Sequence, residues 1–163
     1  MFLADNWKDY EIIDTGNGEK LERWGKYLLR RPDPQAIWKT EKPFSDKVDG
    51  FYHRSKSGGG NWEFFTKMPE RWVIENDGLK FFVRPTGFKH TGLFPEQAVN
   101  WEYIKEHTES GTKVLNLFAY TGGATLAAAS KGADVVHVDA SKGMVNWAKE
   151  NLELSGLSDK YVR

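Results

Sequence analysis

Short apolar runs separated by turn signals fill the first half of the chain and predict a β-rich region. Two of the signals are Gly16-Asn17-Gly18 and Asn76-Asp77-Gly78. Asn-Gly and Asp-Gly pairs favour tight hairpins because both central residues must take a positive φ. The predicted strands cover residues 10–14, 20–24, 27–30, 36–38, 72–75 and 79–84.

After residue 95 the period changes, and compact apolar runs alternate with helix-forming segments. Strands are predicted at 114–118 and 133–139, and a third strand begins at 160–163. Helices are predicted at 95–108, 124–132 and 142–156. Strands and helices that alternate with short connections are typical of a parallel sheet. The predicted class is therefore α/β: a small β-rich region at 1–86, then the first half of a Rossmann-like parallel sheet at 87–163.

Composition and charge narrow the function classes. The 163 residues carry 23 Lys+Arg against 23 Asp+Glu and no cysteine, which excludes a disulfide framework, a thiolate metal site and a thiol nucleophile. We expect no metal site, and no apolar stretch is long enough to cross a membrane. The N-terminus lacks the basic segment of a signal peptide, so a cytoplasmic protein is expected.

The zero net charge hides a basic stretch at residues 20–56, with ten basic and five acidic residues. Interleaved with tryptophans, it could face RNA phosphates, and Lys20, Arg23, Arg30 and Arg31 are the candidate contacts. The alternative is that these side chains alternate with apolar ones on a half-solvated sheet.

Candidate chemistry lies at the turn that follows the strand at 114–118. In parallel sheets, ligands bind at the carboxyl ends of the strands. This turn holds Gly122 and Gly123 and opens a helix, whose free amides favour an anion. Asp139 ends the next strand, at the spacing of an acid that accepts hydrogen bonds from ribose. The pattern therefore predicts a pocket for a cofactor that contains adenosine.

S-adenosylmethionine fits this turn better than NAD does. A dinucleotide needs glycines spaced G-x-G-x-x-G, whereas here Ala119, Tyr120 and Thr121 precede the glycine pair and would crowd a diphosphate. Two alternatives stay open: the glycines serve only strand–helix packing, and Asp139 caps the next helix, a role for which Ser141 competes.

The stretch VLNLFAYTGGATLAAASKGADVVHVDASKGMVNWAKENLELSGL resembles the cofactor-binding half of class I S-adenosylmethionine-dependent methyltransferases. It is most similar to the bacterial group related to the large-subunit rRNA cytosine-5 and guanine-7 methyltransferases. The segment FKHTGLFPEQAVNW is similar to that group's segment before motif I, and the resemblance extends over about residues 7–163.

The resemblance implies a set of cofactor contacts. Asp139 would bind the ribose, with Ala140 and Ser141 beside the adenine. Core packing is the alternative for Phe94 and Phe118, and a turn role is the alternative for His90. Asn116 differs from the acidic residue that most class I enzymes carry near this position. The motif I loop would comprise Asn116, Phe118, Ala119, Tyr120, Gly122 and Gly123, and the methionyl end would be lined by Lys89, His90, Gly92, Phe94 and Gln97.

The resemblance further implies that the chain is the N-terminal part of a longer enzyme. The family's Asp-Pro-Pro motif IV would lie beyond Arg163, so the catalytic residues stay unassigned. The expected function is methylation of RNA, with rRNA as the expected substrate; an NAD-dependent oxidoreductase and a noncatalytic RNA-binding module are the alternatives. The first parallel strand would keep an unpaired edge, which favours homodimers or other association.

Overall fold

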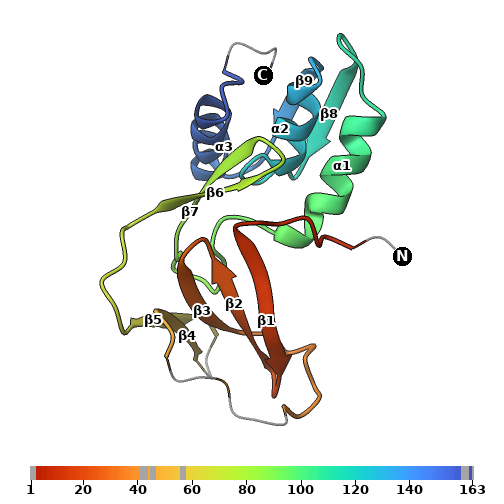
Figure 1. Ribbon diagram of the computed structural model, residues 1–163. Coiled ribbons are helices and arrows are strands. Elements are labelled where there is room, and N and C mark those ends of the chain that lie inside the picture. Colours follow the sequence, from red (N-terminus) through yellow and green to blue (C-terminus); the bar gives the residue numbers. More distant parts are fainter. Residues whose placement is uncertain (1–2, 41–43, 45–46, 56–57, 159–161, 163) are drawn as a thin grey trace. The chain divides into compact units, whose positions relative to one another are not determined.

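Two compact units form the protein, as the computed structural model shows (Figure 1). The structure describes residues 3–40, 44, 47–55, 58–158 and 162. The small-sheet unit comprises Trp7–Ile74 and Val83–Gly92, and the parallel-strand unit comprises Met1–Asn6, Glu75–Phe82 and Leu93–Arg163. The predicted boundary after residue 86 falls within the second segment of the small-sheet unit, and the domain assignment stays a prediction.

A five-stranded sheet forms most of the small-sheet unit. Its strands lie in chain order, antiparallel from β1 to β3, parallel between β3 and β4, and antiparallel again between β4 and β5. Asn17 and Gly18, between β1 and β2, both have positive φ (53° and 78°), as the hairpin signal predicted. The strands are β1 (Tyr10–Gly16), β2 (Glu19–Trp24), β3 (Tyr27–Pro32), β4 (Gly50–Arg54) and β5 (Gly60–Phe64).

One predicted strand is wrong, and β4 and β5 were not predicted. Residues 36–38 form no strand, although the N–H of Asn17 donates to the carbonyl of Trp38 at 2.7 Å. The side chains of Ile37 and Trp38 are 85% and 53% exposed, so Ala36 is the only residue of this segment that is buried, which leaves little apolar surface to hold it in a sheet. The parallel pairing of β3 with β4 joins segments that are distant in the sequence, and no local pattern reveals it.

The predicted hairpin at Asn76-Asp77-Gly78 is confirmed. It joins β6 (Trp72–Asn76) to β7 (Leu79–Val83), and Asp77 and Gly78 both have positive φ (47° and 77°). Such a pair matches the right-handed twist of the two strands.

Side chains of the last helix satisfy the outer edge of β7. The helix is α3 (Lys142–Leu154), and Ser155 follows it. Lys80 N–H donates to Ser155 Oγ at 2.9 Å, and Phe82 N–H donates to Asn151 Oδ1 at 2.8 Å. The indole of Trp147 donates to the carbonyl of Phe82 at 3.0 Å. Backbone groups that would otherwise lack partners are therefore paired by a helix.

The parallel-strand unit has the predicted order of strands and helices. Strands β8 (Lys113–Leu117) and β9 (Asp134–Val138) pair in parallel, and Val162 bridges Val135 in parallel, where the third strand was predicted to begin. Residues 160, 161 and 163 of that prediction lie outside the described residues. The helices before α3 are a 3₁₀ turn η1 (Pro95–Gln97), α1 (Ala98–Glu106) and α2 (Gly123–Ser130). The predicted α/β class is confirmed.

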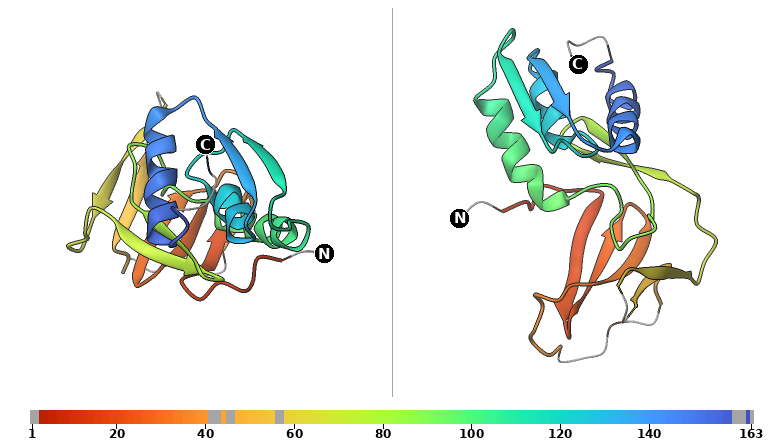
Figure 2. Two further views of the ribbon diagram at one scale, coloured as in Figure 1. Left: turned by 90° about the horizontal axis from the view of Figure 1, so that it is seen from above. Right: turned by 180° about the vertical axis from the view of Figure 1, so that it is seen from behind.

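The two faces of the β8–β9 pair differ. Figure 2 shows the strands side by side, with α1 flanking one and α3 flanking the other. Helix α2 is buried through most of its length and contacts both strands. Large apolar side chains on alternate positions of the strands are exposed: Leu115, Leu117, Val136 and Val138.

Candidate functional site

The loop after β8 is wound through three left-handed residues. Phe118, Tyr120 and Gly122 have φ of 54°, 52° and 93°. Positive φ suits glycine, but at the other two residues it costs on the order of 1–3 kcal/mol each, and such strain gathers at functional sites. The N–H of Ala119 donates to the carbonyl of Val138 at 3.0 Å, so the loop leaves the sheet only after pairing with the end of β9.

Asp139 holds this loop against the start of α3. Its Oδ2 accepts from the N–H of Tyr120 at 2.9 Å, and its Oδ1 accepts from the N–H of Ser141 at 2.8 Å. These backbone hydrogen bonds, that from Ser141 first, hold the pKa of the Asp139 carboxyl below its usual range. Ser141 is the N-cap of α3 and its Oγ accepts from Met144 N–H, so Ser141 takes the capping role that was an alternative for Asp139.

A cavity of about 480 Å³ lies between this loop and the segment around η1. Phe94 and Tyr120 face each other across the two segments, with ring centroids 5.3 Å apart. Predicted site residues that line the cavity are Phe94, Gln97, Asn116, Phe118, Ala119, Tyr120 and Gly123. Residues more than 20 positions apart in the chain thus meet at one cavity.

A comparison with known proteins identifies the family. The family model for S-adenosylmethionine-dependent methyltransferases matches residues 47–162. The chain belongs to this family.

Two ribosomal RNA large subunit methyltransferases are among its relatives. Methyltransferase K/L of Shewanella frigidimarina is 42% identical over 109 residues, which are 64% of this chain and 15% of that protein. Methyltransferase K of Neisseria meningitidis is 31% identical over 152 residues, or 87% of this chain and 43% of that protein. The chain thus spans less than half of each.

The crystal structure of an S-adenosylmethionine-dependent methyltransferase from Agrobacterium tumefaciens has the same fold. It is 43% identical in sequence, with a TM-score of 0.89, over 98% of this chain and 52% of that one. The likeness to this methyltransferase structure therefore extends over both units.

Both glycines of the methyltransferase motif I are needed for packing. A Cβ on Gly123 would lie 2.6 Å from the ring of Trp101, and a Cβ on Gly122 would lie 3.0 Å from that of Ala148. The packing role that was the alternative for these glycines is therefore present, while Gly123 also lines the cavity.

Several cavity residues were missed by sequence reasoning. Trp101 lies one helical turn after Gln97, so helical spacing could have indicated it. The carboxylate of Glu96 had no such signal, because it lies in the 3₁₀ turn. The missed residues are Leu93, Glu96, Trp101, Thr121 and Ala124.

The other predicted contacts do not line this cavity. Lys89, His90 and Gly92 belong to the small-sheet unit, so their contribution to the site stays a prediction. The carbonyl of His90 accepts from Thr86 N–H at 3.2 Å, which gives it the turn role. Core packing, the alternative for Phe118, is wrong, because that side chain is 91% exposed. The predicted residues outside the cavity lining in the parallel-strand unit are Gly122, Asp139, Ala140 and Ser141.

The basic side chains proposed for phosphate contact are engaged within the small sheet. Arg31 makes a two-pronged contact with the buried Glu22 at 2.6 and 2.8 Å, and Lys20 lies 3.4 Å from the same carboxylate. Burial opposes the charge of Glu22, yet Arg31 and Lys20 hold the pKa of that carboxyl below its usual range. Arg30 pairs with Glu19 at 2.5 Å. Arg23 pairs with Glu11 at 3.4 Å. These four basic residues therefore lie on a half-solvated sheet and do not form a free phosphate-binding patch.

Within the described part of the chain, no helix is both long and apolar enough to span a membrane. Over the same residues, no three His, Asp or Glu side chains gather as a metal site would require.

Proposed function

We propose that the chain binds S-adenosylmethionine in the cavity beside the motif I loop, as the cofactor-binding part of an RNA methyltransferase. The observation that carries the proposal is the arrangement around Asp139. An ionised carboxylate follows β9 directly and accepts a hydrogen bond from the strained loop that follows β8, in a chain that belongs to the methyltransferase family.

The carboxylate of Asp139 suits the ribose hydroxyls. Each of its oxygens already accepts one backbone N–H, and each retains a further lone pair for a hydroxyl donor. Ala140 and Ser141, which follow it, would lie beside the adenine. Held by two amides, the carboxylate needs little reordering when the cofactor binds.

The cavity suits the methionyl end. Gln97 Oε1 accepts from Asn100 at 2.8 Å, so its amide nitrogen is the end that can donate to a carboxylate. Glu96 supplies a negative charge for the ammonium, and the rings of Phe94 and Tyr120 offer apolar faces. The N–H groups that begin α2 add positive partial charge near the carboxylate.

When bound, the cofactor supplies a methyl group on a positively charged sulfur. The residues described here would orient that sulfonium and exclude water, which is the contribution expected of a protein that positions a reactive cofactor. No side chain of the site is assigned to activation of the acceptor.

RNA, and rRNA in particular, is the substrate that we propose, because relatives that match 64% and 87% of the chain are named ribosomal RNA large subunit methyltransferases. The cytoplasm, where ribosomes are modified, is the proposed location. We also propose that the exposed face of β8 and β9 lets two copies of the chain associate.

Isothermal titration calorimetry with S-adenosylhomocysteine, the reaction product of the cofactor, tests the site. We expect binding to the unsubstituted chain, weakened in Asp139→Ala by about 1–3 kcal/mol through loss of ribose hydrogen bonds. Asp134→Ala, at the opposite end of the same strand, is the matched control and should bind as the unsubstituted chain does. Binding of NADH with no signal from S-adenosylhomocysteine would overturn the proposal and favour an oxidoreductase.

A further inference from the structure

A hydrogen-bonded chain of three side chains lies behind the motif I loop. Asn116 on β8 and His137 on β9 are direct partners in the parallel register, and Thr125 of α2 lies between them. Asn116 Nδ2 donates to Thr125 Oγ1 at 2.9 Å, and Thr125 Oγ1 lies 2.9 Å from His137 Nδ1. Thr125 is fully buried, so water does not compete for these contacts.

The single proton of the Thr125 hydroxyl links the two ends of this chain. If His137 Nδ1 is bare, Thr125 donates to it and can accept only from the nitrogen of the Asn116 amide. If Nδ1 carries a proton, Thr125 accepts from His137, and its own proton is free to go to the Asn116 carbonyl oxygen. A bare Nδ1 therefore holds the amide nitrogen toward Thr125, whereas a protonated Nδ1 allows the amide to turn.

The nitrogen of Asn116 faces Thr125 in the structure, as the first setting requires. Asn116 also lines the cavity beside the loop, and among the described residues none donates to its Oδ1. The carbonyl oxygen is thus the end of the amide available to a ligand.

We propose that Thr125 is a positioning residue that fixes the Asn116 amide with its carbonyl oxygen, an acceptor, toward a hydrogen-bond donor of the bound cofactor, and that the bare Nδ1 of His137 sets this direction. This inference rests on the proposed cofactor site. It gives Asn116, which departs from the acid usual in the family, a way to present an oxygen of fixed orientation.

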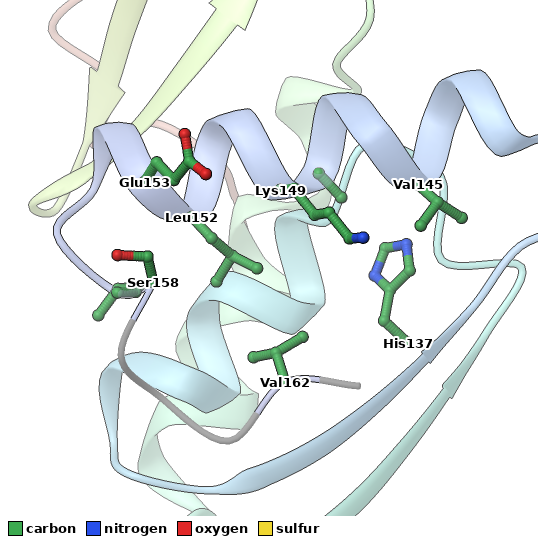
Figure 3. A pocket seen from close by; sticks show the side chains of 9 residues that line it. His137, Val145, Lys149, Leu152, Glu153, Ser158 and Val162 are labelled. Carbon is green, nitrogen blue, oxygen red and sulfur yellow. The ribbon is translucent and has the colours of Figure 1, made fainter.

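The surroundings of His137 favour its neutral form. Burial lowers the pKa of the imidazole, against the opposing effect of Asp139. Its Nε2 is buried and has no hydrogen-bond partner among the described residues. Figure 3 shows the ring at the wall of a second cavity of about 330 Å³, where Lys149 extends toward it from α3 and Glu153 lies farther along.

Substitution of Thr125 tests the positioning role. Thr125→Val keeps the side-chain shape and removes the hydroxyl. The affinity for S-adenosylhomocysteine should then fall roughly 5- to 15-fold, because the Asn116 oxygen is no longer held toward the ligand and about one hydrogen bond is lost. Thr125→Ser restores the hydroxyl and should recover most of the affinity. Ser130→Ala removes a hydroxyl from the same helix that only donates to the carbonyl of Ala127, and should leave the affinity unchanged.

A double substitution separates positioning from simple packing. In Asn116→Asp the side chain presents an oxygen whichever way it turns, so Thr125→Val in that background should change affinity by less than about twofold. An equal loss in both backgrounds would show that Thr125 only fills space, and would overturn the inference.

Nitrogen-15 NMR of the His137 ring gives an answer that does not depend on ligand binding or on whether the valine variant folds. We expect a bare Nδ1 and a protonated Nε2 in the free chain, and the reverse tautomer would overturn the inference. If the chain binds no S-adenosylhomocysteine, the proposed function is wrong. The tautomer of His137 still shows to which neighbour the Thr125 hydroxyl donates.

Discussion

At the scale of residues, basic side chains that the sequence suggested for RNA contact instead pair with a buried carboxylate. Glu22 is fully buried and receives Arg31, Lys20 and the hydroxyl of Tyr10. Removing one member of such a cluster leaves the others uncompensated in a medium of low polarity, which costs more than the intact cluster contributes. Arg31 and Lys20 of the basic stretch therefore compensate a buried carboxylate within the small sheet.

Glu22→Gln should lower the free energy of unfolding by about 3–5 kcal/mol, because Arg31 stays buried opposite a neutral amide. Glu19→Gln breaks the partly exposed pair with Arg30 and should cost about 0–1 kcal/mol. Urea denaturation at neutral pH measures both. Equal costs would mean that burial adds nothing to the Glu22–Arg31 pair.

The same carboxyl predicts a pH dependence. Its pKa is lowered in the folded state. Its contribution is therefore fully present above the unfolded value of about 4.3 and is lost as the pH falls through the lower folded value. Unfolding followed from pH 6 downward should show less acid destabilisation in Glu22→Gln than in the unsubstituted chain, and identical profiles would contradict this assignment.

At the scale of elements, α3 replaces a strand as the partner of β7 and also reaches the site. Asn151 is fully buried; its Oδ1 accepts from Phe82 N–H, and its Nδ2 donates to the carbonyl of Thr121 at 2.9 Å. Thr121 belongs to the motif I loop and lines the cavity. One amide thus ties the helix, the hairpin and the loop together.

Asn151→Leu should destabilise the chain by about 1–3 kcal/mol for each backbone group left unpaired. Because Thr121 loses its anchor, the affinity for S-adenosylhomocysteine should fall as well. Asn146→Leu, the same change at an exposed position of α3, is the control and should alter neither quantity. Thermal unfolding and calorimetry on the two variants measure these effects, and similar results for both would refute the anchoring role.

At the scale of the whole molecule, one face of the parallel strands is apolar and uncovered among the described residues. Leu115 and Leu117 are 63% and 54% exposed, and they lie next to Val136 and Val138. An exposed apolar patch beside a strand edge favours association. This geometry supports the proposed pairing of two copies.

Sedimentation of the chain should show self-association that grows with protein concentration. Leu117→Lys places a charge in the patch and should shift the chain toward monomer. Ile37→Lys, at an isolated exposed residue of the small-sheet unit, should have no effect. A monomer at all concentrations would refute association through this face.

The sequence by itself determined the elements whose signals are local. The Asn76-Asp77-Gly78 hairpin, the order of the parallel strands and helices, and the loop with Gly122 and Gly123 all follow from turn residues and apolar periodicity within a few positions. The class of cofactor followed from the residues of that loop, from the spacing of Asp139 on the next strand, and from the resemblance that both carry.

Only the tertiary structure decided the features that depend on distant partners. The failure of residues 36–38 to form a strand, the burial of Arg31 against Glu22, and the place of Trp101 at the cavity each arise from contacts between separate segments. The direction of the Asn116 amide is of the same kind, since it depends on one hydroxyl from a helix and one nitrogen from the neighbouring strand. Hydrogen-bond partners and burial depend on which segments the fold brings together, and the local sequence pattern does not specify those segments.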